Sequence, residues 1–171
     1  MLGFVTIDND APGAANRILA EAAQLLANRG VRLAGAVQFN IDHGPDRDCD
    51  MDLRILGDDG PEIRISQSLG SCSQGCRLDT DALMQAAGRI VAVLDRGAEL
   101  VILNKFGKQE CRGGGFREVI ARALHDDIPV LLYVPPQMLA DFHAFAGDLA
   151  QPVSAASMQD WCLGALDRPA A

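Results

Sequence analysis

The feature that most constrains the fold is the run Leu100-Val101-Ile102-Leu103, four aliphatic residues that are followed at once by polar and glycine residues. A short apolar run with such boundaries is typical of a buried strand in an α/β protein. The start of the chain agrees, because residues 4–8 and 31–39 predict strands on either side of a helix over 14–28. Such a unit crosses over right-handedly and makes a parallel pair. We therefore expect an α/β fold of three layers, a mostly parallel sheet with helices on both faces.

The remaining segments complete this pattern with one interruption. Two short strands, 52–56 and 62–66, flank the turn at residues 57–60 and predict an inserted β-hairpin. One more strand is expected at 130–134. Four more helices are expected at 80–96, 116–125, 137–145 and 157–166, and the last of them docks Trp161 and Leu166 on the body of the protein. Segments without periodicity, expected as loops, are 40–50, 67–78 and 104–115.

Length and composition limit the classes of protein that fit. The 171 residues suit a single α/β domain over 1–171, and a net charge of -8 argues against nucleic acid as a partner. The N-terminus lacks the features of a signal peptide, and no window has the eighteen or so apolar residues of a membrane span. An odd number of cysteines without framework spacing agrees with reduced thiols. We expect a cytoplasmic protein without a membrane partner.

The two lysines of the chain, Lys105 and Lys108, follow the 100–103 run directly. Ligands of α/β sheets bind at the carboxyl ends of the strands, so ammonium groups there predict an anion site. We expect Asn104, Lys105, Lys108 and Arg112 to bind the anion. Glu110 is a candidate catalytic residue that positions a metal ion or a water. The alternative is a solvated basic loop neutralised by Glu110 and nearby acids.

A second candidate anion-binding segment precedes the helix expected at residue 80. Small residues and hydroxyl groups at a helix N-terminus let an oxyanion approach backbone N–H groups, and an arginine adds a charged fork. The residues expected to bind are Gly70, Ser71, Cys72, Ser73, Gln74, Gly75, Cys76 and Arg77. The alternative is an ordinary flexible connection. Our central expectation is that this loop and the lysine segment face each other over one cavity.

Other candidate sites rest on fewer residues. Asp8, at the end of the first strand, is expected either to hold a metal ion or repel wrong anions, or else to cap the next helix. Cys72, Cys76 and Cys111 would converge on a metal only if both loops meet above the sheet. No Ser-His-Asp order, paired catalytic carboxylates or Gly-x-Gly-x-x-Gly fingerprint is present, and the Walker A pattern is missing. Asn104-Lys105-Phe106-Gly107 lacks the aspartate that reads guanine in GTPases.

Three strings in this sequence resemble a bacterial family, domain of unknown function 2478. They are Arg64-Ile65-Ser66-Gln67-Ser68-Leu69-Gly70, Gly75-Cys76-Arg77-Leu78-Asp79 and Leu103-Asn104-Lys105-Phe106-Gly107-Lys108-Gln109-Glu110. The resemblance covers nearly the whole chain and implies a small nucleoside-triphosphatase-like or molybdenum-associated protein. The last string is also similar to the metal-holding Asp-Glu-x-Gly-x-Met-Glu motif of a small P-loop nucleoside-triphosphatase family. Gly107 and Glu110 match that motif, whereas Asn104 and Lys105 replace its acidic pair, which implies a P-loop-like scaffold with a more positive pocket.

These observations lead to one functional hypothesis with two alternatives. We expect an oxyanion-binding protein linked to molybdenum handling, with molybdate or the phosphates of a nucleotide as ligand. The enzymatic alternative is a weak nucleoside-triphosphatase in which magnesium and a nucleotide are bound and Glu110 holds the metal or water. The non-catalytic alternative is an interaction protein of a metalloenzyme assembly, whose acidic face around residues 42–52 and 58–59 docks a protein partner. A homo-oligomer also remains open.

Overall fold

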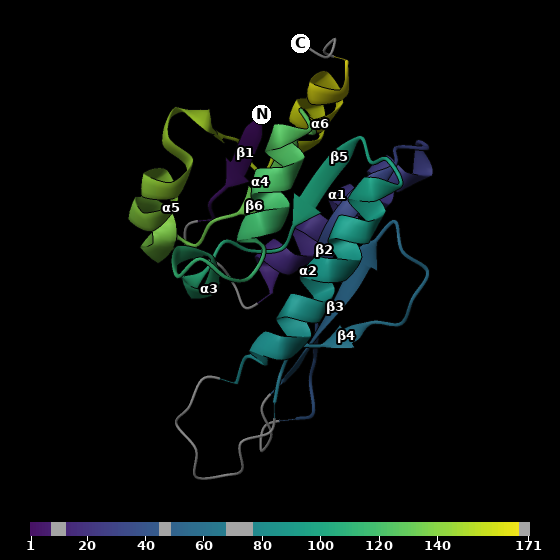
Figure 1. Ribbon diagram of the computed structural model, residues 1–171, viewed down its shortest axis with the longest axis vertical. Coiled ribbons are helices and arrows are strands. Elements are labelled where there is room, and N and C mark those ends of the chain that lie inside the picture. The colour runs from purple at the N-terminus through teal and green to yellow at the C-terminus, as the bar shows by residue number, and fades with distance from the viewer. Residues whose placement is uncertain (8–12, 45–48, 68–76, 168–171) are drawn as a thin grey trace.

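The computed structural model describes residues 1–7, 13–44, 49–67 and 77–167, which form a seven-stranded sheet with helices on both faces (Figure 1). The strand order is β4-β3-β2-β5-β6-β1-β7. In chain order the strands are β1 (Leu2–Val5), β2 (Leu33–Ile41), β3 (Asp50–Leu56), β4 (Ile63–Arg64), β5 (Leu100–Leu103), β6 (Val130–Tyr133) and β7 (Ala150–Pro152). The α/β class and the three-layer architecture predicted from the sequence are confirmed, in agreement with a P-loop-like scaffold.

Five strands run parallel, and the predicted hairpin adds two antiparallel strands at one edge. β2, β5, β6, β1 and β7 pair in parallel, whereas β3 pairs antiparallel with both β2 and β4. β1 and β2 are parallel but are separated by β5 and β6, so the predicted direct pairing of β1 with β2 is wrong. β5 and β6 come later in the chain and are inserted between β2 and β1. From β1 the chain crosses the sheet in one direction to β2, whereas from the neighbouring β6 it crosses in the other direction to β7. A ligand crevice is expected at such a switch point.

The helices divide into two layers, one on each face of the sheet. In chain order they are α1 (Ala14–Asn28), α2 (Thr80–Asp95), α3 (Lys108–Cys111), α4 (Arg117–His125), α5 (Leu139–Ala146) and α6 (Met158–Leu166). Leu19 and Leu26 of α1 share one core with Cys162 of α6, whereas Ile90 of α2 and Phe142 of α5 belong to the opposite core. Both faces of the parallel strands are therefore buried, as the aliphatic composition of β5 requires.

Local sequence signals account for the best-predicted helices. α1 has the bounds predicted for it and is followed by Gly30, which adopts φ 82°. α2 begins after Asp79, whose carboxylate accepts hydrogen bonds from the backbone N–H groups of Asp81 and Ala82. The predicted docking of α6 is also confirmed, because a Cβ on Gly3 would lie only 2.6 Å from Cζ2 of Trp161.

Several segments expected to be loops carry regular structure. The loop predicted over 104–115 contains the single turn of α3, and the unpredicted edge strand β7 is only three residues long. β2 and β3 extend to Ile41 and Asp50, inside the segment expected to be an acidic loop. The ends of the loop predicted over 67–78 are held together by a bridge between Ser66 and Leu78. α3, β7 and the added ends of β2 and β3 are each too short to show a periodic pattern of apolar residues, so the sequence does not indicate them.

Two short 3-10 helices, Pro136–Met138 and Gly147–Leu149, flank α5. No helix in the described ranges has the length and apolar character needed to cross a membrane.

Candidate functional site

Asn104 lies at the carboxyl end of β5 and joins this strand to β2. Its side chain is only 3% exposed. Nδ2 donates to Oε1 of Gln38 at 3.1 Å, and Oδ1 accepts from the backbone N–H of Gln38 at 3.3 Å. Ladder pairing of the two strands ends at Ala36 and Leu103, so Asn104 prolongs their contact at the carboxyl edge of the sheet. Both polar atoms of the amide thus have protein partners, and Lys105 is the next residue.

Glu110 fastens the segment that carries the lysines. Its side chain is buried, and the residue is 4% exposed. Oε2 accepts from the backbone N–H of Gly107 at 2.8 Å, and Oε1 accepts from that of Phe116 at 2.9 Å. Burial raises the pKa of this carboxyl, while the two backbone hydrogen bonds and the charge of Lys105 act in the opposite direction. Each carboxylate oxygen thus accepts a backbone hydrogen bond, and the side chain links the backbone on the two sides of α3.

The three cations predicted to bind the anion are exposed. Within the described part of the chain, Lys105, Lys108 and Arg112 form no ion pair within 4 Å and no side-chain hydrogen bond. Most described arginines, in contrast, have a carboxylate partner. These are Arg17, Arg32, Arg54, Arg64, Arg77, Arg89 and Arg122. The three exposed cations therefore lie at the carboxyl edge of the sheet, next to β5, without an ion-pair partner within 4 Å in the described residues, although the charge of Lys105 also acts on the buried carboxyl of Glu110.

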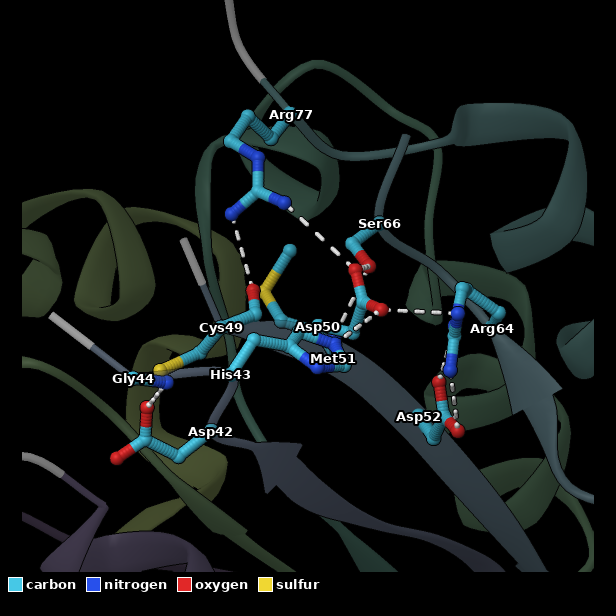
Figure 2. Close-up of polar contacts among 10 residues, drawn as sticks. All are labelled: Asp42, His43, Gly44, Cys49, Asp50, Met51, Asp52, Arg64, Ser66 and Arg77. Carbon is cyan, nitrogen blue, oxygen red and sulfur yellow. Dashed lines mark hydrogen bonds and ion pairs between the residues drawn. The ribbon is translucent and has the colours of Figure 1, made fainter. Parts of the chain in front are cut away.

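Arg77 belongs to a polar cluster at the start of β3, around Asp50 (Figure 2). Its Nη1 donates to the backbone carbonyl of Cys49 at 2.9 Å, and its Nη2 lies 3.7 Å from Oδ1 of Asp50. Residues 70–76, the rest of the second predicted anion segment, lie outside the described residues, and so does Asp8. The facing of the two loops over one cavity, and the metal role of Asp8, therefore stay predictions.

The acidic face considered for partner docking is largely compensated by bases in the described residues. Asp50 contacts Nε2 of His43 at 2.8 Å and Nη1 of Arg64 at 2.8 Å, and it also accepts from Ser66 (Figure 2). The hydrogen bond from His43 is the main reason that the pKa of Asp50 is lowered. Asp52 pairs with the same arginine at 2.9 Å. These carboxylates hold β3, β4 and the following segment together.

Asp58 has a similar structural role in the turn of the hairpin, where it pairs with Arg89 of α2 at 2.6 Å. A metal site is not formed by the residues that the structure describes, since no three His, Cys, Asp or Glu side chains converge. Of the three cysteines proposed to converge, only Cys111 falls within the described ranges.

The family described as protein of unknown function (DUF2478) matches residues 4–161. The chain belongs to the DUF2478 family. No solved structure matches it.

One curated relative of this DUF2478 protein is the "Molybdenum import ATP-binding protein ModC 2" of Bradyrhizobium diazoefficiens. The two are 35% identical over 133 residues, which is 77% of this chain but 15% of the relative. The chain thus spans about a seventh of that protein's length.

Proposed function

We propose that this DUF2478 protein binds an oxyanion, molybdate or the phosphates of a nucleotide, at the carboxyl edge of its sheet. The observation that carries the proposal is the exposed pair Lys105 and Lys108 beside β5, neither of which forms an ion pair within 4 Å in the described residues, in a chain whose net charge is -8. Exposed ammonium groups without a carboxylate partner attract a small anion, and a lysine binds a phosphate or a similar anion as a point charge.

The fastening of the lysine segment supports the same proposal. The buried carboxylate of Glu110 holds the backbone on both sides of α3 through Gly107 and Phe116. The backbone that carries the lysines is therefore constrained before a ligand arrives, which reduces the entropy lost on binding. In this proposal Glu110 is a positioning residue.

The molybdenum part of the proposal is supported by the relative named as a molybdenum import protein. The ATP binding in that name is not transferred directly, because this chain lacks the Walker A pattern and covers 15% of the relative. An anion site that depends on lysines at a strand end needs no Walker A loop. We propose that the protein handles or senses molybdate or a related oxyanion.

Calorimetric titration with molybdate, tungstate, sulfate, ATP and GTP tests this function. We expect saturable heat with at least one of these anions and a clear loss of affinity in a Lys105→Ala/Lys108→Ala variant. The matched control is Arg29→Ala/Arg32→Ala, which removes two cations at the amino end of β2, on the opposite edge of the sheet. No heat and no thermal shift with any anion would refute the proposal, and so would equal binding by the lysine variant and the parent protein.

The enzymatic alternative stays a prediction with its own test. A magnesium-dependent nucleoside-triphosphatase that uses Glu110 should lose phosphate release in a Glu110→Gln variant. Release that survives this substitution unchanged would rule out the assigned role of the carboxylate. The docking alternative is tested by capture of a defined partner from native lysate, which the anion-binding proposal does not require.

A further inference from the structure

An open groove runs along the outer side of α1, where no sequence motif predicted a site. It has a volume of about 480 Å³ and is lined by the first three turns of α1, by the last part of β2 and by Arg54 of β3. Gln38 belongs to its lining and is hydrogen-bonded to Asn104, the residue before Lys105. Gln38 therefore connects the lining of the groove with the residue that precedes Lys105, at the carboxyl edge of the sheet.

Hydrogen bonds among side-chain amides determine which groups on this side of the groove donate and which accept. Asn104 donates Nδ2 to Oε1 of Gln38, which leaves Nε2 of Gln38 as a donor. That Nε2 donates to Oδ1 of Asn40 at 2.8 Å, and Nδ2 of Asn16 approaches the same oxygen at 3.5 Å. The oxygen of Asn40 is thereby occupied, so its Nδ2 is left to donate and the Oδ1 of Asn16 is left to accept. Asn40 thus keeps a donor and Asn16 an acceptor, and both residues line the groove.

Arg54 gives the groove a flat guanidinium surface, whose charge is paired with Glu62. Its Nε and Nη2 donate to Oε1 of Glu62 at 3.0 and 2.7 Å, and the guanidinium carbon lies 4.7 Å from the centre of the Phe39 ring. The guanidinium is therefore held in one orientation. Planar rings, nucleobases included, stack on a fixed guanidinium. Arg17 on α1 adds a second positive charge, and its partner Glu21, 3.9 Å away, lies one helical turn further along the groove.

We propose that this groove holds the base and sugar of a nucleotide whose phosphates reach Lys105, so that the ligand of the site is a nucleotide rather than molybdate alone. The inference rests on the proposed function and names its ligand class. A volume of about 480 Å³ is in the range of sites for ligands with a ring system, and a four-oxygen anion would fill little of it. The adjacent donor and acceptor of Asn40 and Asn16 match the edge of a nucleobase, which presents both kinds of group.

The test compares ATP with inorganic tripolyphosphate, which carries the same phosphates without base or sugar. Calorimetry should show ATP binding at least about tenfold more tightly than tripolyphosphate. Asn40→Ala and Arg54→Ala should each weaken ATP binding by about 3- to 10-fold, the equivalent of one hydrogen bond or stacking contact. Both variants should bind tripolyphosphate like the parent protein, which also shows that they are folded.

The outcomes separate the two proposals. If tripolyphosphate or molybdate binds through the lysines while ATP gains nothing and Asn40→Ala has no effect, the groove proposal is overturned and the oxyanion function stands. If no anion binds, the oxyanion function fails as well. Loss of ATP binding only in Lys105→Ala/Lys108→Ala, with Arg54→Ala unchanged, also overturns the groove proposal.

Discussion

Gly115 lies against the buried carboxylate of Glu110, and replacing it with alanine tests whether this carboxylate fastens the lysine segment. Gly115 adopts φ 57°, and a Cβ at this position would overlap Oε1 of Glu110, which accepts from the N–H of Phe116. The added methyl group must displace the carboxylate. Gly113 is the matched control, because it adopts φ 87° but a Cβ added there would meet no atom within 4 Å.

The structure sets the expected sizes of the two effects. Alanine in the left-handed region costs about 1–2 kcal/mol at either position. Displacing the carboxylate at Gly115 also breaks at least one hydrogen bond to a charged group, worth about 1.5–3 kcal/mol. We therefore expect Gly115→Ala to lower the free energy of unfolding by about 2.5–5 kcal/mol and Gly113→Ala by about 1–2 kcal/mol. In a protein of this size these losses correspond to decreases in Tm of about 5–20 °C and 2–8 °C.

Thermal and guanidinium unfolding followed by circular dichroism measure both variants. The same substitutions in a Glu110→Ala background complete a double-mutant cycle, in which the excess cost of Gly115→Ala over Gly113→Ala should disappear. Equal Tm values for the two glycine variants in the parent background would refute the fastening role of Glu110. An excess cost that persists without the carboxylate would do the same.

Three further predictions follow from individual contacts. Asn104→Leu removes both hydrogen bonds between β5 and the end of β2, so the free energy of unfolding should fall by about 1–3 kcal/mol in guanidinium unfolding; an unchanged transition midpoint would contradict this. The pKa of Asp50 is lowered from 3.8, mainly by the hydrogen bond from His43, so its stabilising contribution is present above that pH and is lost as the pH falls through the lowered value. The Tm difference between the parent protein and Asp50→Asn should therefore shrink below about pH 4, and a difference that grows in acid would reverse the sign of this argument. Burial raises the pKa of Cys162 to about 12, so iodoacetamide at pH 8 should modify the exposed Cys49 well before Cys162, and equal rates by mass spectrometry would contradict the buried position.

Much of the fold could be predicted because its signals are local. The helix over residues 14–28 combines a regular apolar spacing with a glycine stop, and both signals lie within the segment itself. The order of the strands is a different kind of property. β1 and β2 are consecutive in the chain but are separated by two strands that come later, and no local pattern in the sequence indicates this insertion.

The same distinction between local and long-range properties applies to the residues of the candidate site. The position of Lys105 at the carboxyl edge of the sheet follows from the apolar run before it, and in the structure Lys105 does lie just beyond the end of β5. The partners of Asn104 and Glu110 could not be predicted. Gln38 is 66 residues away from Asn104 in the sequence, and Glu110 contacts backbone groups that every residue type except proline carries. The only local sign of the fastened carboxylate is Gly115, whose lack of a side chain leaves room for it.

Selective labelling of lysine offers the most direct measurement of the central claim, because Lys105 and Lys108 are the only lysines in the chain. Protein grown with lysine labelled with ¹³C at Cε should give only two side-chain Cε signals in a proton–carbon correlation spectrum. During titration with molybdate, ATP or tripolyphosphate, at least the Lys105 signal should shift and saturate at the midpoint measured by calorimetry. Binding heat that leaves both lysine signals unmoved would place the anion elsewhere and contradict the account.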